Sequence, residues 1–509
     1  MPKSFDIIYC ITIFSIFVII RINREIIYVI YFLFEYCQGG LFMTKTAVSH
    51  RPFGFRDKLG YLMGDFGNDF TFILSSSFLL KFYTDIMGVE AYVVGIVMMI
   101  TRFIDGFTDV TMGRICDRSK LTAHGKFKPW ILRMCIPVAV SSFLIYQSSL
   151  ASLPYWVKVV YLFVTYTLWG SVFYTSINIP YGSMASAISA EPSDRQSLST
   201  YRTMGGVFAG VIIGAGVPIF AFTRNEEGRE VLNGTRFTAI AGVFSVLAIL
   251  AYVACYFLVT ERVRPKQDTA AMKRNNVIKM IANAFKNRAL ISVIAASIVM
   301  LLAQLTMQGM SAYLYPNYYN SSAAQSASTI VMMAGMVIAA AVSKPLANRF
   351  GKAEVSVVAN FIAAGVYLVL FFIRPQNVWV FVAINSLSWI GLGIFSMISW
   401  AFVTDVIDYS ELKNGIREDG SVYALYSFAR KLGQAASAGL TGALLSFIGY
   451  TDATAFEPNV LKGIYSVSTI VPSIGFVVLG FILWLWYPLH KKRVEENVKA
   501  LKEKHSKYE

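Results

Sequence analysis

The stretch that decides the fold of this chain is TRFIDGFTDVTMGRICDRSKLTAHGKFKPW, which runs from Thr101 to Trp130. Its first half continues an apolar run that begins near Val93, and the combined run is long enough to cross a bilayer as a helix. Its second half is a basic loop. The stretch therefore predicts a membrane helix that ends in a positively charged loop.

Three charged side chains lie within this predicted span: Arg102, Asp105 and Asp109. A charge near the centre of a bilayer costs at least about 2.5–3.5 kcal/mol, so such residues usually serve a function. Asp105 and Asp109 stand four residues apart and share a helix face, with Thr108 beside them. Together these side chains offer oxygen ligands to a cation, or one of the carboxylates can take up a proton. Alternatively, Arg102 neutralises Asp105 in a structural ion pair, but that pairing leaves Asp109 unexplained. We therefore expect a cation site here.

The whole chain has the composition of a membrane protein. Of its 509 residues, 56% are hydrophobic and 15% are charged, and the mean hydropathy is +0.55. Apolar runs of about 20 residues recur along most of the sequence, which is typical of a polytopic helical membrane protein and excludes a soluble one. The formal charge of +15 comes mainly from loops and the tail. Membrane orientation explains this charge better than a nucleic-acid partner does.

The positions of the cysteines and histidines limit which kinds of site the chain can form. The five cysteines show no paired spacing, so the sequence predicts neither a disulfide framework nor a metal cluster. All four histidines lie outside the predicted spans, so proton chemistry within the membrane would depend on carboxylates. With no Ser-His-Asp order either, we expect neither an enzyme nor a cofactor.

Hydropathy predicts twelve membrane spans in two groups of six. Their expected boundaries are 59–82, 91–113, 129–149, 156–181, 203–223, 236–259, 289–313, 325–344, 354–373, 377–403, 421–448 and 464–487. The loops after even-numbered spans carry most of the Lys and Arg, which places both termini in the cytoplasm of a multi-pass cell-membrane protein.

The longest charged connector, 261–288, separates an N-terminal half at 43–260 from a C-terminal half at 289–489, and a cytoplasmic tail follows at 490–509. Two six-helix halves fit the all-α architecture of the major facilitators, whose substrate site lies near mid-membrane between the halves. We expect a monomer.

Residues 1–42 do not fit this pattern, because two apolar runs flank a charged stretch without a signal-peptide cleavage site. Met43 begins a polar, basic lead that is typical of a cytosolic start. We therefore expect that translation begins at Met43. The alternative is a genuine hydrophobic hairpin or anchor.

Further polar residues in the spans indicate a sugar site, because carboxylates and amides commonly bind sugar hydroxyls and aromatic rings cover the sugar's C–H face. The first span contains Asp65, Asn68 and Asp69. The remaining candidates lie in or near spans four, five and eleven: Trp169, Tyr174, Asn178, Arg202 and Lys431. Thr175, three residues before Asn178, could face span two. For each aromatic residue taken alone, packing between helices is the simpler explanation.

Four charged residues lie at predicted cytoplasmic ends of spans. Asp117 and Arg118 follow span two in a Gly-x-x-x-Asp-Arg pattern, and Asp405 and Asp408 end span ten. A solvated gate or a salt-bridge network explains these positions.

From about Gly54 to Pro488 the sequence resembles the glycoside–pentoside–hexuronide:cation symporters of the major facilitator superfamily. The motifs that carry the resemblance are RFIDGFTDVTMGRICDRS with GKFKPW, NIPYGSMASAIS, and DVIDYSELKNGIREDG with YSFARKLGQA. The resemblance implies that Asp105, Asp109 and Thr175 hold the coupling cation, Na⁺ or H⁺. It also implies that the sugar is held by Asp69, Asn178, Arg202 and Lys431.

Two departures from the melibiose-carrier branch of this family leave the specificity open. Thr108 replaces an asparagine, so the choice between Na⁺ and H⁺ stays open. Asn178 replaces an aspartate, and Gly182 replaces a tryptophan. Losing a carboxylate while keeping Arg202 and Lys431 favours a glycoside or a uronide. The resulting hypothesis is symport of a sugar with a monovalent cation by alternating access, and the alternative is a lipid or drug transporter on the same fold.

Overall fold

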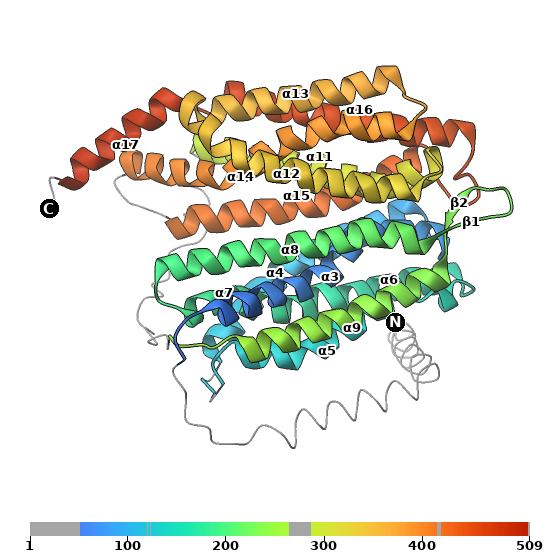
Figure 1. The fold of residues 1–509 in the computed structure, drawn as a ribbon, viewed down its shortest axis with the longest axis horizontal. Coiled ribbons are helices and arrows are strands. Elements are labelled where there is room, and N and C mark those ends of the chain that lie inside the picture. The colour runs from blue at the N-terminus through green and yellow to red at the C-terminus, as the bar shows by residue number, and fades with distance from the viewer. Residues whose placement is uncertain (1–50, 120, 123, 264–286, 415–418, 507–509) are drawn as a thin grey trace, which may run out of the picture. The chain divides into compact units, whose positions relative to one another are not determined.

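The computed structural model describes residues 51–119, 121–122, 124–263, 287–414 and 419–506. The hydrophobic stretch 1–42 and most of the predicted linker 261–288 lie outside these residues. Phe53–Glu509 forms one compact unit, which Figure 1 shows as a bundle of long helices.

Twelve membrane helices follow one another in the described part of this unit, as predicted. The first six, here called the N-half, are α3 (Phe55–Asp85), α4 (Ala91–Arg118), α5 (Lys128–Ile145), the continuous α6–η2–α7 (Tyr155–Thr167, Leu168–Tyr174, Thr175–Ile188), α8 (Pro192–Ala221) and α9 (Gly234–Leu258). A short 3₁₀ turn, η1 (Ser148–Leu150), precedes α6, and strands β1 (Phe222–Arg224) and β2 (Glu230–Leu232) form an antiparallel hairpin after α8.

The second six helices form the C-half. They are α11 with η3 (Arg288–Tyr313, Leu314–Tyr318), α12 (Ser322–Phe350), α13 (Lys352–Ile373), α14 (Val378–Asn414), α15 (Asp419–Phe447) and α16 with η4 (Pro458–Phe481, Ile482–Trp486). The tail forms α17 (Lys491–Ser506). We call the end of the bundle that carries α17 the tail end and the opposite end, with β1 and β2, the hairpin end (Figure 1).

Several helices extend beyond the spans predicted from hydropathy, mostly toward the tail end. For example, α14 continues to Asn414 and α12 to Phe350. Hydropathy detects only the apolar part of such a helix, whereas polar residues continue the same hydrogen-bonding pattern into water. Side-chain caps define some of the starts, since Asn233, Asn287 and Ser321 each accept a hydrogen bond from a backbone N–H of the first turn of the following helix.

The two halves meet along a small number of helices, and one hydrophobic cluster contains buried residues of both. In the N-half, α3 packs against α8 and α9, and in the C-half α11 packs against α15 and α16 while α14 packs against α12 and α13. Between the halves, α4 packs along α15, α8 along α12 and α3 along α11. In Figure 1 the C-half occupies the upper part of the view and the N-half the lower part.

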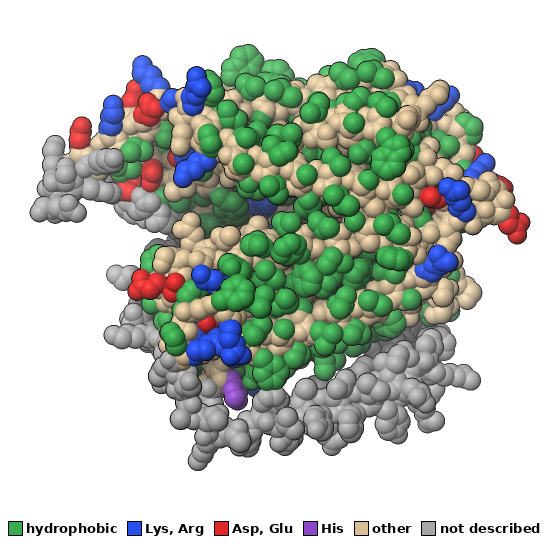
Figure 2. Space-filling model, viewed as in Figure 1, with side chains coloured by type: hydrophobic (Ala, Val, Ile, Leu, Met, Phe, Trp, Pro, Cys, Tyr) green, Lys and Arg blue, Asp and Glu red, His purple; other side chains and the backbone are tan. Residues whose placement is uncertain are grey.

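The outer surface is suited to a bilayer. Within the described residues, nine helices are long and apolar enough to cross a membrane by length and composition alone. The three others, α3, α4 and α15, carry the charged residues discussed above and face the interface between the halves. Figure 2 shows hydrophobic side chains over the middle of the unit and most Lys, Arg, Asp and Glu side chains toward its two ends.

At the hairpin end, α4 and α15 approach closely through small residues. A Cβ atom on Gly95 would lie 2.9 Å from the carbonyl oxygen of Ala438, so only glycine permits this approach without a shift. The β1–β2 hairpin of the N-half also reaches the C-half, because the Glu230 amide donates to Asn320 (2.6 Å) and the Glu230 carboxylate accepts from the Ser322 amide at the start of α12.

A buried lysine completes the closure of this end. The Lys81 ammonium on α3 donates to Asn317 of η3 at 2.6 Å and to the Tyr450 hydroxyl at 2.8 Å, and it pairs with Asp85 at 2.7 Å. The Tyr313 ring of α11 lies 4.4 Å from the same ammonium. The two halves are thus held together at the hairpin end by charge-assisted hydrogen bonds as well as by close packing.

Candidate functional site

A cavity of about 950 Å³ lies between the two halves. Its walls come from α3 and α8 of the N-half and from α11, α12 and α14 of the C-half, with single residues of α13, α15 and α16. This volume lies at the upper end of the range of small-molecule sites. Figure 2 shows the surface hollowed between the halves on the side of the tail end.

Asp69 is the acidic residue of the cavity wall that has no partner. It lies on α3 and forms no hydrogen bond or ion pair with any other described residue. Gly206 of α8 faces it, and a Cβ atom there would lie 2.5 Å from the Asp69 carboxylate. The glycine thus lets the Asp69 carboxylate lie close against α8. Because no donor of the described residues pairs with this carboxylate, it can accept a hydrogen bond from a ligand hydroxyl or take up a proton.

The second acidic residue of this wall is already paired. Asp65, one turn before Asp69, accepts a hydrogen bond from Arg202 Nε at 3.0 Å. The Arg202 guanidinium also lies 5.3 Å from the centre of the Tyr181 ring, and its side chain is 41% exposed. Arg202 therefore presents a partly accessible cation on Asp65, one helical turn from the unpaired Asp69.

Asn68 and Asn178 are hydrogen-bonded to each other within the N-half. Asn68 is buried, accepts a hydrogen bond from the Tyr252 hydroxyl at 2.8 Å, and donates to Asn178 at 3.4 Å. These contacts join α3, α7 and α9 within the N-half. The structure thus places Asn68 in a polar core contact, while its neighbour Asp69 faces the cavity.

Trp169 and Tyr174, the aromatic residues predicted for the sugar, belong to a cluster of rings near Arg102 in this structure. Arg102 lies within 4.9–5.8 Å of the ring centres of Phe72, Tyr166 and Trp169. Trp169 is fully buried, and Tyr174 contacts both the Trp169 and the Phe72 rings. Their contacts in this conformation are those of an aromatic cage for Arg102.

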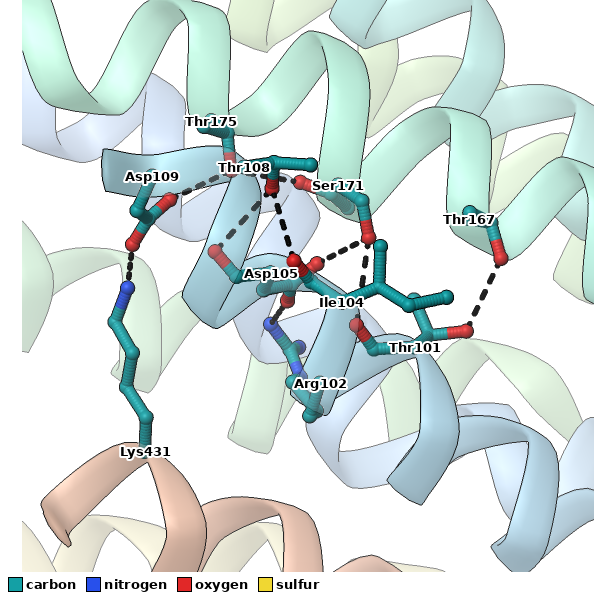
Figure 3. Close-up of polar contacts among 11 residues, drawn as sticks. Thr101, Arg102, Ile104, Asp105, Thr108, Asp109, Thr167, Ser171, Thr175 and Lys431 are labelled. Carbon is teal, nitrogen blue, oxygen red and sulfur yellow. Dashed lines mark hydrogen bonds and ion pairs between the residues drawn. The ribbon is translucent and has the colours of Figure 1, made fainter. Parts of the chain in front are cut away.

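Asp105 is held by two side chains of the N-half (Figure 3). Arg102 donates to it at 3.0 Å, and the Ser171 hydroxyl donates to its other carboxylate oxygen. Ser171 lies in the π-helical segment η2, which brings the backbone at Gly170 close to Asp105. The structural ion pair considered from the sequence is therefore present, and it neutralises Asp105.

Asp109 is shared between the two halves (Figure 3). The Thr175 hydroxyl of α7 donates to one of its oxygens at 2.8 Å, and the Lys431 ammonium of α15 forms an ion pair with the other. The sequence predicts Lys431 at the sugar, whereas the structure places it on a predicted cation ligand. Thr108 contributes no side-chain contact to this group, since its hydroxyl donates to the carbonyl oxygens of Ile104 and Asp105.

The four residues predicted for a gate are dispersed. Asp405 of α14 pairs with Lys352 of α13 at 2.6 Å, so this salt bridge lies within the C-half. Asp408 lies one turn further along α14. Asp117 is exposed at the end of α4, and the structure does not describe the Arg118 side chain.

Sequence reasoning missed several residues of this region. Ser171 is an ordinary serine in an apolar run, and only the π-helical geometry brings it to Asp105. Gln308 of α11 lines the cavity and donates to Ser77 of α3 at 3.0 Å across the two halves. A polar residue within span seven was the available signal for Gln308. No local signal singles out Ser171.

Comparison with known proteins agrees with this architecture. Residues 60–491 match the family described as MFS/sugar transport protein. The chain is 27% identical over 463 residues to a glucuronide carrier protein homolog of Escherichia coli K12, covering 88% of this chain and 96% of that protein. It is 29% identical over 457 residues to an isoprimeverose transporter of Lactiplantibacillus pentosus, covering 88% and 92%.

A solved structure shows the same fold at low sequence identity. The nucleoside transporter NupG, as its D323A mutant, superposes with a TM-score of 0.61 at 12% identity, covering 85% of this chain and all of that one. Together with the match along nearly the whole chain and the two six-helix halves, these findings confirm the resemblance noted in the sequence. The chain belongs to the MFS/sugar transport protein family, as a membrane transporter of the glycoside–pentoside–hexuronide:cation symporter type.

Proposed function

We propose that this protein imports a glycoside or uronide together with a monovalent cation, Na⁺ or H⁺, by alternating access across the cell membrane. The observation that carries this proposal is the position of Asp109, which contacts Thr175 in the N-half and Lys431 in the C-half. A ligand that binds this carboxylate acts directly on a contact between the halves.

The coupling cation and the Lys431 ammonium are alternative partners of Asp109 in this proposal. Both need the carboxylate of Asp109, so cation binding releases Lys431 from α4. Asp105 stays neutralised by Arg102, which leaves Asp109 as the group that exchanges partners. Thr175 supplies a neutral oxygen to the same cation.

In this proposal the sugar binds in the central cavity, to Asp69 and Arg202 of the N-half. An unpaired carboxylate accepts sugar hydroxyls, and a partly exposed guanidinium donates to a hydroxyl or a carboxylate. Relatives named for glucuronide and isoprimeverose support a sugar or uronide as cargo. A purely apolar lipid or drug would leave Asp69 buried without a partner, which is costly.

The orientation in the membrane follows from the loops. The basic residues after the even-numbered spans lie at the tail end, which supports the expectation that this end and both termini face the cytoplasm. The hairpin end is closed by Lys81 and the β-hairpin, so the proposed orientation makes this conformation inward-open.

The test is cation-dependent uptake of labelled glycosides into vesicles. We expect Asp109→Cys to lose both stimulation by Na⁺, Li⁺ or a pH step and accumulation against a gradient, because no carboxylate remains to hold the cation. Some sugar binding should persist, since Asp69 and Arg202 are unchanged. Asp117→Cys is the matched control, because Asp117 lies exposed at the end of the same helix. Accumulation by Asp109→Cys driven by any of these ions would place the coupling site elsewhere.

A further inference from the structure

The β1–β2 hairpin, residues 222–232, is a rigid extension of the N-half. β1 follows α8 directly, and β2 leads through Asn233 into α9. The turn between the strands is fixed, because the Asn225 amide donates to the Arg229 carbonyl oxygen and the Asn225 side chain accepts from the Arg229 amide, both at 2.9 Å. Gly228 completes this turn with φ +75°, which glycine adopts without strain. The hairpin therefore shares the movement of α8 and α9.

Asn320 of the C-half binds the backbone of this hairpin. It lies between η3 and α12, and its side chain accepts a hydrogen bond from the Glu230 backbone amide at 2.6 Å. The same side chain donates to the Gly228 carbonyl oxygen at 3.1 Å. Asn320 has φ +50°, a left-handed conformation that is uncommon outside glycine. One side-chain amide thus uses both its donor and its acceptor across the two halves.

Glu230 and Arg229 make further contacts to the C-half. The Glu230 carboxylate accepts from the Ser322 amide at the start of α12, where backbone N–H groups have no partner within the helix and the helix dipole favours a negative charge. The Arg229 guanidinium lies 4.9 Å from the centre of the Phe456 ring, in the loop between α15 and α16. The hairpin therefore contacts two connections of the C-half at this end of the bundle.

These contacts form a layer separate from the buried Lys81 group. Lys81 and Asn317 are buried between the helices, whereas Asn320 and Arg229 are exposed on the surface. Since α8 packs along α12, opening of the hairpin end separates the hairpin from the C-half. Water replaces exposed hydrogen bonds, so each contact shifts the closed–open equilibrium only a few-fold and can be broken in every transport cycle.

We propose that the β-hairpin is a second gate at the hairpin end. Docked on Asn320, Ser322 and Phe456, it favours the closed state, and its release is a step of every opening. The contacts act together because one rigid hairpin has to leave all three positions in a single movement. This inference goes beyond the proposed function, since it assigns control of access to a surface segment and holds for any cargo.

The first experiment measures how fast a cavity thiol is labelled from the hairpin side. Ser77 lines the cavity, so Ser77→Cys in a protein without native cysteines reports opening to a membrane-impermeant thiol reagent. Asn320→Gly removes both side-chain hydrogen bonds and tolerates the positive φ. We expect about tenfold faster labelling, because each net hydrogen bond changes an equilibrium about two- to twelve-fold.

A second variant and a matched control accompany this measurement. Glu230→Ala removes the contact with the Ser322 amide and keeps the backbone contacts with Asn320, so we expect a smaller increase. Gln147→Ala should leave the rate unchanged, because the Gln147 amide lies at the same end but donates to the Phe143 carbonyl oxygen within the N-half, at 2.7 Å. An unchanged rate in Asn320→Gly, or an equal increase in Gln147→Ala, would overturn the inference.

The second experiment fixes the hairpin in its docked position. Arg229→Cys and Phe456→Cys are combined in a protein without native cysteines and bridged by a reducible bifunctional thiol reagent. Bridging should stop uptake of labelled glycoside, reduction should restore it, and each single variant should be unaffected by the reagent. Undiminished uptake by the bridged protein would contradict the role of the hairpin. A protein that takes up no glycoside before bridging contradicts the proposed function instead, and the labelling rates then decide the role of the hairpin.

Discussion

Replacing Lys81 with methionine should open the hairpin end of the protein. Methionine keeps much of the length and apolar volume of the lysine stem but removes the ammonium. The variant therefore loses the hydrogen bonds from Lys81 to Asn317 and Tyr450, which connect α3 to the C-half. It also loses the contact of the ammonium with the Tyr313 ring.

The size of the effect follows from these contacts. Hydrogen bonds that involve a charged group contribute about 1.5–3 kcal/mol each, and a cation–π contact adds about 0.5–2 kcal/mol. In the open state, hydration of the ammonium and its pairing with Asp85 on the same helix recover part of this sum. A net loss of about 3 kcal/mol corresponds to a shift of about 100-fold in the equilibrium between closed and open hairpin ends.

The shift can be measured with a single cysteine in the cavity. Ser77 lines the cavity on α3, so Ser77→Cys serves as reporter in a protein whose five native cysteines are replaced by serine. A membrane-impermeant thiol reagent is added from the hairpin side, and the labelling rate reports the open population. We expect much faster labelling with Lys81→Met, and a smaller increase with Tyr450→Phe, which removes one hydroxyl from the same group.

Lys158→Met is the matched control. Lys158 also lies at the hairpin end, but its ammonium contacts the Ala151 carbonyl oxygen within the N-half, at 3.3 Å. An unchanged labelling rate in Lys81→Met, or an equal increase in Lys158→Met, would show that Lys81 does not hold the hairpin end closed. A double-mutant cycle between Lys81 and Asn317 would then show whether the two residues are coupled at all.

Two further predictions use the same reporter. Asp69→Asn and Arg202→Ala should each weaken the protection of the Ser77→Cys thiol by the transported glycoside about 10- to 100-fold, since each removes a charge-assisted hydrogen bond to the sugar. Unchanged protection in either variant would remove that residue from the sugar site. Desolvation and the neighbouring Asp85 charge raise the pKa of Asp452 in the loop after α15, although Lys81 acts in the opposite direction. A raised pKa of this carboxyl means that its protonation stabilises the closed hairpin end, so the labelling rate should increase as pH rises through this pKa. Asp452→Asn should lose this pH dependence. A pH dependence that persists in the variant would contradict the assignment to Asp452.

In the proposed symport, the carboxylate of Asp109 links cation binding to sugar binding. If a cation raises sugar affinity, sugar must raise cation affinity by the same factor, because the coupling free energy belongs to both. In this proposal Asp109 and Lys431 provide the contact, since they pair across the two halves. Measuring each affinity at saturating concentrations of the other ligand would test this reciprocity directly.

The sequence by itself determined the membrane class, the twelve helices and the main charged positions. These features are local: a span needs about 20 consecutive apolar residues, and residues four apart on a helix share a face wherever the helix lies. For this reason Asp105 and Asp109 could be identified as neighbours, and Arg102 as a possible partner of Asp105, before any packing was known. The unusual cost of charge in lipid made the same residues conspicuous.

The tertiary structure alone decided which partner each charge has. Lys431 lies on Asp109 because α15 packs along α4, and Lys81 reaches Asn317 because α3 meets α11 at the hairpin end. Ser171 reaches Asp105 from a π-helical segment, and the Asp69 carboxylate lies close against α8 because Gly206 has no side chain there. Such contacts depend on the relative placement of helices far apart in the chain, and neither apolar periodicity nor spacing along one helix carries that information.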